Sequence, residues 1–190
     1  MSFPILETER LRLVEITEDY APAMFDIFSR EDVTRYYGMI PFVEEEQAQK
    51  MVQSFAMNFE AKRGIRWGMQ WKESGEYVGS VGLNNLVLAG KRAEVGYELH
   101  PKFWRKGIVS EAVKAVLQYS FQELDLHRIG AVTFPENEAS SNLLLKLGFL
   151  KEGLLRGYIY QGGVSYDANV FSILKTDWVK ILSDTQKRLN

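Results

Sequence analysis

The chain contains no cysteine, and only two of its 190 residues are histidine, His100 and His127. The first absence excludes disulfide bonds, thiolate nucleophiles and cysteine zinc sites. The second argues against a histidine-rich metal centre, so we expect no metal site. The formal net charge of -2 gives no basic excess. A general nucleic-acid binder needs such an excess, so we expect no nucleic-acid partner.

Long apolar runs are also lacking. No stretch approaches the roughly 20 apolar residues that span a bilayer. Residues 1–12 are charged early and lack the apolar segment of a signal peptide. No linker-like tract and no internal repeat divides the chain, and 46% of its residues are hydrophobic. We therefore expect one domain over residues 1–190, in the cytoplasm and without a membrane partner.

The hydrophobic periodicity changes several times along the chain, which predicts both helices and strands. Leu11 and Leu13 alternate with charged residues as in a strand, whereas Val109, Val113 and Val116 recur at helical spacing. The expected order is β-α-α-β-β-β-α-β-α-β-β. The pattern predicts an α+β fold with one mixed sheet and helices packed on its faces. The expected strands are 9–16, 65–72, 77–86, 93–99, 128–134, 158–160 and 166–174, and the expected helices are 19–29, 43–62, 108–124 and 139–147.

A loop before the third of these helices has the character of an anion site. It contains Arg105, Lys106 and Gly107, and the helix starts directly afterwards. A helix N-terminus exposes unpaired N–H groups, which bind phosphate, and Gly107 permits close approach of the backbone. By itself this pattern also fits a solvated basic turn. The glycine-rich signatures G-x-G-x-x-G and G-x-x-x-x-G-K-[ST] are absent from the chain.

Four blocks of sequence, in order, carry a resemblance to a known family. They are ETERLRL at 7–13, EVGYEL at 94–99, WRKGIVSEA at 104–112 and NEASSNLLLKLGFLKEG at 137–153. With these blocks the chain resembles the GNAT acetyltransferases, and among them the RimJ/RimL-like branch, which acetylates ribosomal proteins. The resemblance implies a mostly antiparallel mixed sheet with helices on both faces, and acetyl-CoA as the cofactor.

The resemblance also implies roles for individual residues. The backbone of Leu99 would pair with the pantetheine arm and polarise the thioester carbonyl, and Asn137 would contact the same arm. At the position of Val109 the family pattern has glycine or alanine. The CoA pyrophosphate would be held by the loop and helix start, which comprise Arg105, Lys106, Gly107, Ile108 and Val109.

The absence of cysteine favours direct attack of the amine on the thioester in a ternary complex. The amine must lose a proton, and Glu98, near the end of its strand, is the candidate general base, although a solvent-facing role fits the pattern too. Many GNAT enzymes protonate the thiolate with a tyrosine, and Leu144 occupies that position here. The RimJ/RimL-like branch has a serine instead, which corresponds to Ser140. A helix-capping or packing role for that hydroxyl remains open.

The acceptor stays open at this stage. A protein N-terminal α-amine needs little help to become neutral near pH 7, because its pKa of about 7.7–8.0 lies well below that of lysine. A small-molecule amine is the alternative, and Tyr36 and Tyr37 are candidates to line the acceptor pocket. A non-catalytic acyl-CoA-binding module and an unrelated nucleotide-binding protein are competing hypotheses. We expect a monomer, or a homodimer formed through edge strands of the C-terminal hairpin.

Overall fold

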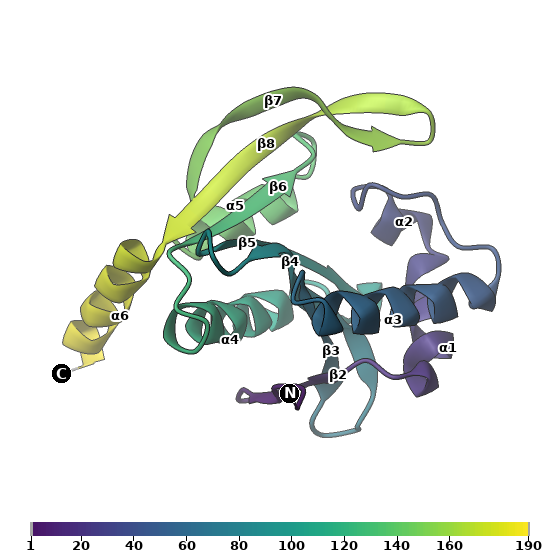
Figure 1. The fold of residues 1–190 in the computed structure, drawn as a ribbon, viewed down its shortest axis with the longest axis horizontal. Helices are drawn as coiled ribbons and strands as arrows, with labels where there is room; N and C mark the ends of the chain where they lie inside the picture. The colour runs from purple at the N-terminus through teal and green to yellow at the C-terminus, as the bar shows by residue number, and fades with distance from the viewer. Residues whose placement is uncertain (1, 190) are drawn as a thin grey trace.

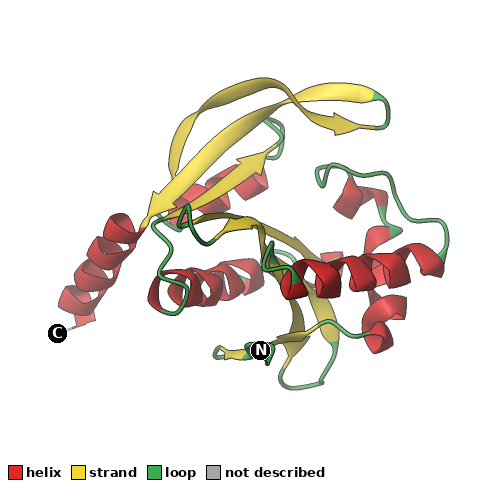
Figure 2. Ribbon diagram, viewed as in Figure 1, coloured by secondary structure: helices red, strands yellow, loops and turns green. Residues whose placement is uncertain are grey.

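The computed structural model describes residues 2–189, which form one eight-stranded sheet with helices against it (Figures 1 and 2). The strand order is β1-β2-β3-β4-β5-β6-β8-β7, and only the pair β5–β6 is parallel. The predicted α+β fold is confirmed. The strands are β1 Leu6–Glu7, β2 Leu11–Glu15, β3 Ile65–Trp71, β4 Tyr77–Val87, β5 Arg92–Leu99, β6 Arg128–Thr133, β7 Leu150–Gln161 and β8 Val164–Leu174, and the helices are α1 Ala21–Phe28, α2 Glu31–Thr34, α3 Glu45–Glu60, α4 Ile108–Gln122, α5 Glu138–Lys146 and α6 Lys175–Leu189.

Side chains of the sheet alternate between two apolar cores. Ile65, Trp67 and Met69 of β3 face the larger core, in which α4 contributes its apolar stripe. Helices α1 and α3 build the second core on the other face (Figure 1). Arg66, between Ile65 and Trp67, lies on this second face and stacks over Phe55 of α3. A strand's period of two thus puts a cation of β3 beneath α3.

The central parallel pair separates along its length. Strands β5 and β6 are paired only from Arg92 to Glu94 on β5. Beyond that point β5 continues to Leu99 beside β4, while β6 continues to Thr133 beside β8. The residues of β5 from Val95 to Leu99 therefore have no strand partner on one side. Side chains on both faces of β5 can reach the gap that opens there.

The structure extends the predicted element list at three places. The short strand β1, the single turn α2 and the C-terminal helix α6 were not predicted. Helix α6 packs Trp178 and Ile181 against the larger core, whereas Val179 and Leu182 are exposed together with its polar residues up to Lys187. Its apolar stripe is narrow, which explains why periodicity in the sequence did not reveal it. None of the helices in residues 2–189 is long and apolar enough to cross a membrane.

The C-terminal hairpin is longer than the sequence indicated. Strand β7 begins at Leu150 rather than at residue 158, and β8 begins at Val164. Irregular pairing between Lys151 and Gly153, and between Leu155 and Ile159, breaks the alternation that identifies a strand. Strand β7 is the edge of the sheet, and the hairpin it forms with β8 reaches toward α2 (Figure 1).

Candidate active site

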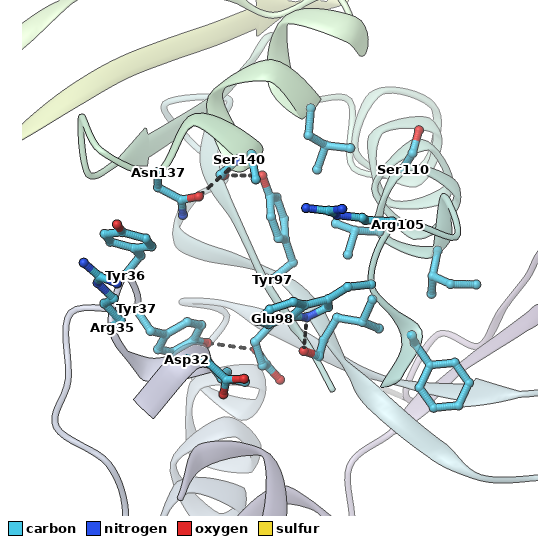
Figure 3. Close-up of a pocket in the computed structure, with 18 of the residues that line it drawn as sticks. Asp32, Arg35, Tyr36, Tyr37, Tyr97, Glu98, Arg105, Ser110, Asn137 and Ser140 are labelled. Carbon is cyan, nitrogen blue, oxygen red and sulfur yellow. Dashed lines mark hydrogen bonds between the residues drawn. The ribbon is translucent and has the colours of Figure 1, made fainter. Parts of the chain in front are cut away.

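A cavity of about 650 Å³ opens at the splayed end of β5. Its walls come from β5, from α2 and the loop after it, from the loop before α4, and from α5. Figure 3 shows the side chains that converge on it, with Tyr36 and Tyr37 at one end and Arg105 at the other. Three stretches that are distant in the sequence, 32–37, 97–110 and 137–143, therefore meet at the end of β5.

The N-terminus of α4 forms the Arg105 end of the cavity. Gly107, which precedes the helix, has φ 72°, and Arg105 has φ 60°. Two residues of the loop therefore have positive φ before the helix begins. Ile108, Val109 and Ser110 form the first turn and line the cavity. The first N–H groups of a helix have no partner within it, and the helix dipole adds partial positive charge. This end of the cavity is therefore suited to an anion.

The loop is fixed from behind by an ion pair. The Arg10 side chain donates from Nε to Glu111 Oε2 at 2.7 Å and from Nη1 to the Lys106 carbonyl at 2.9 Å. Glu111 Oε1 accepts hydrogen bonds from the Thr8 hydroxyl and the Arg10 backbone. Burial opposes ionisation of Glu111, but the Thr8 and Arg10 hydrogen bonds outweigh it and lower its pKa. The N-terminal segment thereby holds the loop in its left-handed conformation.

The predicted cofactor-binding residues in this region do not all line the cavity. Arg105 lines the cavity, whereas the side chain of Lys106 lies over the ring of Phe103, outside the lining. Val109 lies in the first turn of the helix, where no positive φ is needed, so its branched side chain meets no backbone conflict. The Leu99 side chain lines the cavity, and its carbonyl accepts a 2.8 Å hydrogen bond from the indole of Trp104.

A buried charged network forms the other end of the cavity. Glu98 and Arg66 form an ion pair in which 2% and 4% of the two side chains are exposed. Glu98 Oε1 accepts a hydrogen bond from Ser80, and Oε2 accepts one from the Tyr37 hydroxyl at 3.1 Å (Figure 3). Arg66 also donates from Nη2 to the Tyr37 hydroxyl at 2.5 Å. Glu98 is therefore not a solvent-facing residue of an exposed strand.

Burial and charge set the protonation of this network. Burial is the largest influence on Tyr37 and raises its pKa, so its hydroxyl stays protonated. Burial opposes the charge on Arg66, but Tyr37 and Glu98 outweigh this and raise its pKa. Glu98 and Tyr37 line the cavity, whereas Arg66 lies behind them. Of the two acidic residues that line the cavity, Asp32 and Glu98, Glu98 is paired with the Arg66 guanidinium, which does not line it.

A pair of hydroxyl groups, from Tyr97 and Ser140, lies on the face of β5 opposite Glu98. Tyr97 and Ser140 are joined by a hydrogen bond of 2.7 Å, and both line the cavity (Figure 3). Asn137 caps α5, because its side-chain carbonyl accepts a hydrogen bond from the Ser140 backbone. Leu144, by contrast, is fully buried in the core. Ser140 is therefore placed at the cavity by a capped helix start, and Leu144 has no access to it.

The hairpin tip fastens the loop that carries the two tyrosines Tyr36 and Tyr37. The Gly38 backbone donates to Gln161 Oε1, and Gln161 Nε2 donates to the Met39 carbonyl, both at 3.1 Å. Tyr36 packs against Phe134, with ring centroids 5.7 Å apart. Both tyrosines line the cavity, as the sequence suggested. The loop therefore closes the side of the cavity opposite α4, and the β7–β8 hairpin holds this loop without lining the cavity itself.

Sequence reasoning missed several of these residues. Arg66 had no signal, since a cation between the apolar Ile65 and Trp67 is also the pattern of a strand with one solvent face. Tyr97 had none, because alternation places it on the face opposite Glu98 and only the splay lets both faces meet one cavity. Gln161 depends on the reach of the hairpin, which sequence patterns do not reveal.

Known proteins are similar to this chain in sequence and in fold. The acetyltransferase (GNAT) domain family matches residues 10–150. The uncharacterised N-acetyltransferase YoaA of Bacillus subtilis is 51% identical over 173 residues, which cover 91% of this chain and 98% of the relative. The ribosomal-protein-serine acetyltransferase of Escherichia coli is 26% identical over 176 residues, or 90% and 97% of the two chains. The crystal structure of a GNAT-family acetyltransferase from Bacillus anthracis has a TM-score of 0.80 at 28% identity, covering 91% and 99%.

The splayed central strands, the helix N-terminus beside them and these matches define an acetyltransferase. The chain belongs to the GNAT acetyltransferase family, so the resemblance seen in its four sequence blocks is confirmed. The relatives include ribosomal-protein N-acetyltransferases of the RimJ/RimL type.

Proposed function

We propose that this chain transfers an acetyl group from acetyl-CoA to a primary amine by direct attack in a ternary complex. The observation that carries the proposal is the single cavity that connects the N-terminus of α4 with the Glu98 carboxylate. One end offers helix N–H groups and Arg105 to an anion, and the other end offers a hydrogen-bond acceptor to an amine. A donor and an acceptor substrate can therefore occupy the cavity together, which direct transfer requires.

The residues present fit acetyl-CoA. The backbone N–H groups of Ile108, Val109 and Ser110, preceded by the left-handed Gly107, would hold the pyrophosphate together with Arg105. The gap left by β6 exposes the edge of β5 up to Leu99, where the pantetheine amides can pair with backbone groups, and Asn137 lies across the same gap. When bound, acetyl-CoA supplies an activated acyl group. The chain's own residues orient it and handle the proton of the amine.

Glu98 is the group we assign to the amine. Its carboxylate lines the cavity, and Arg66, Ser80 and Tyr37 fix its orientation. An ammonium ion cannot attack a thioester, so it must lose a proton before its nitrogen can form the new C–N bond. Glu98 accepts that proton directly or through a water molecule, and Ser140 lies on the other side of β5 to assist the departing thiolate.

For the acceptor we propose a protein N-terminal α-amine. In the described part of the chain, only Asp32 and Glu98 bring carboxylates to the cavity, and Glu98 is balanced by Arg66. A polyamine with several positive charges needs more negative charge than this wall provides. An α-amine reaches its neutral form near pH 7–8 and needs no such charge. The E. coli relative that acts as a ribosomal-protein-serine acetyltransferase supports the same acceptor class.

The test combines ligand-induced stability with turnover. Thermal unfolding is measured with acetyl-CoA, CoA, ATP and NAD, and a ligand at about 100 times its Kd adds about 2.7 kcal/mol. Thiol release is then followed with N-terminal peptides, spermidine and an aminoglycoside. We expect stabilisation by acetyl-CoA and CoA and turnover with peptides. Stabilisation by ATP or NAD instead overturns the cofactor, binding without turnover favours a non-catalytic module, and turnover with only the small amines overturns the acceptor class.

A pair of adjacent cations tests the pyrophosphate site. Replacing Arg105 with alanine is expected to raise the Kd for CoA about tenfold, because a charge-assisted hydrogen bond to phosphate is lost. Lys106→Ala is the matched control, since Lys106 lies outside the cavity lining, and we expect less than about a twofold change. Isothermal titration calorimetry measures both. Equal losses in the two variants would show that only the overall charge of the loop matters.

A further inference from the structure

The hydrogen bond between Tyr97 and Ser140 crosses the gap between β5 and α5. Tyr97 follows Val95 on the face of β5 that packs against the larger core, and its ring is partly buried there. Its hydroxyl reaches the first turn of α5, 2.7 Å from Ser140 Oγ. The Ser140 backbone is fixed by the Asn137 cap. The partly buried ring of Tyr97 and the capped backbone of Ser140 therefore fix both oxygen atoms. Both residues line the cavity.

The chemistry of the two hydroxyls decides which of them donates. A phenol is a stronger hydrogen-bond donor than an alcohol, and the alcohol oxygen is the better acceptor. Burial raises the pKa of Tyr97 to about 12, with a smaller opposing effect of Ser140, so the phenol keeps its proton. If Tyr97 donates to Ser140, the serine hydrogen cannot point back at Tyr97. It is then free to point into the cavity.

We propose that Tyr97 is a positioning residue that turns the Ser140 hydroxyl hydrogen toward the sulfur of the departing CoA thiolate. The inference rests on the proposed function, since it assumes an acetyl thioester and an amine in this cavity. It also explains how the chain works with Leu144, a buried core residue, at the position where many family members have a tyrosine. A serine oriented by a tyrosine of the neighbouring strand takes over the stabilisation of the thiolate.

The step balances without any further reactant. The amine nitrogen forms the C–N bond, the C–S bond breaks, and its electron pair remains on sulfur. Ser140 donates a hydrogen bond to that sulfur, and Tyr97 donates to Ser140. The ammonium first loses a proton to Glu98, which releases it to solvent. The nitrogen loses a second proton as the amide forms, and that proton passes through water to the thiolate. The products are the amide and the free thiol, and Tyr97 and Ser140 end in their starting protonation states.

The kinetic test is a double-mutant cycle. Ser140→Ala is expected to lower kcat about 100-fold, and Tyr97→Phe about tenfold, with the KM for acetyl-CoA nearly unchanged. Because Tyr97 acts only through Ser140, the double variant should match Ser140→Ala. Independent, multiplying losses would overturn the inference, and so would a Tyr97→Phe variant with the activity of the unmodified protein.

A binding measurement keeps the inference separate from turnover. Bound CoA is titrated by the ultraviolet absorbance of its thiolate, which requires no acceptor. If Ser140 donates to the sulfur, the pKa of the bound thiol is lower in the unmodified protein than in Tyr97→Phe or Ser140→Ala, because a donor stabilises the charged form. Equal thiol pKa values in all three proteins would overturn the proposal.

Controls exclude a purely structural effect. Tyr119→Phe removes a hydroxyl from a partly buried tyrosine of α4 that packs on Trp67 outside the cavity, and we expect no change in kcat or in the thiol titration. Tyr97→Phe keeps the buried ring, so its thermal unfolding should stay close to that of the unmodified protein. If the unmodified protein acetylates no amine, the proposed function fails. If it acetylates peptides and Tyr97→Phe changes neither measurement, only this inference fails.

Discussion

Replacing Arg66 with methionine is expected to lower the free energy of unfolding by about 3–5 kcal/mol. The methionine fills a similar volume but leaves the Glu98 carboxylate buried without its counter-ion. Glu98 then keeps only the neutral donors Ser80 and Tyr37, and Tyr37 loses the hydrogen bond from the guanidinium. For a chain of this size the loss corresponds to a fall in Tm of about 10 °C. Urea unfolding monitored by tryptophan fluorescence measures the free energy, and thermal unfolding gives Tm.

The cause of this loss can be separated from poor packing by pH and by a double variant. Protonation of the stranded carboxylate relieves the penalty, so the deficit of Arg66→Met should shrink on acidification. Adding Glu98→Leu to Arg66→Met removes both charges and should recover most of the stability, because an apolar pair of similar volume has no charge to desolvate. A loss of unfolding free energy below about 1 kcal/mol in Arg66→Met, or a loss that does not change with pH, would contradict a buried ion pair with these contacts.

The fold was largely predictable because its regular elements carry their own signals. The alternation around Leu11 and Leu13 and the helical stripe of α4 each identify one element from local sequence alone. The full length of the C-terminal hairpin was not, since irregular pairing around Gly153 and Gly157 erases the period of two that marks a strand. Its length matters for function, because only a long hairpin brings Gln161 to the loop after α2.

The candidate site was predictable only where its residues are neighbours in the sequence. Arg105 and Gly107 lie next to a helix start in the sequence, so local chemistry suggests an anion site there, and the resemblance of the four sequence blocks favours it over a solvated basic turn. The partners of Glu98 come from β3, β4 and the loop after α2, and no local pattern joins Arg66, Ser80 and Tyr37 to it. The same holds for Tyr97 and Ser140, which meet only because β5 has separated from β6. Side chains that converge through tertiary structure leave little trace in one sequence.

Replacing Glu98 with glutamine is expected to have the largest effect on catalysis, and the effect should depend on pH. Glutamine keeps the shape of the side chain but cannot accept a proton. Near pH 6.5 we expect kcat/KM for an N-terminal peptide to fall about 100- to 1000-fold. Near pH 9.5 the gap should narrow to about tenfold, because an α-amine with a pKa of about 7.7–8.0 has already lost its proton to solvent. Thiol release across this pH range measures the ratio.

That dependence distinguishes a base from a structural residue. If Glu98 only supports Arg66 and Tyr37, its loss lowers activity by a similar factor at every pH, since no proton transfer is affected. Glu94→Gln is the matched control, because Glu94 lies four residues earlier on the same face of β5 but outside the cavity lining, and the activity of this variant should follow that of the unmodified protein. Affinity for CoA should survive in both variants, since the α4 end of the cavity is untouched. If the ratio of kcat/KM between Glu98→Gln and the unmodified protein is the same at every pH, water is the base. The Glu98–Arg66 pair would then only hold Tyr37 against the acceptor.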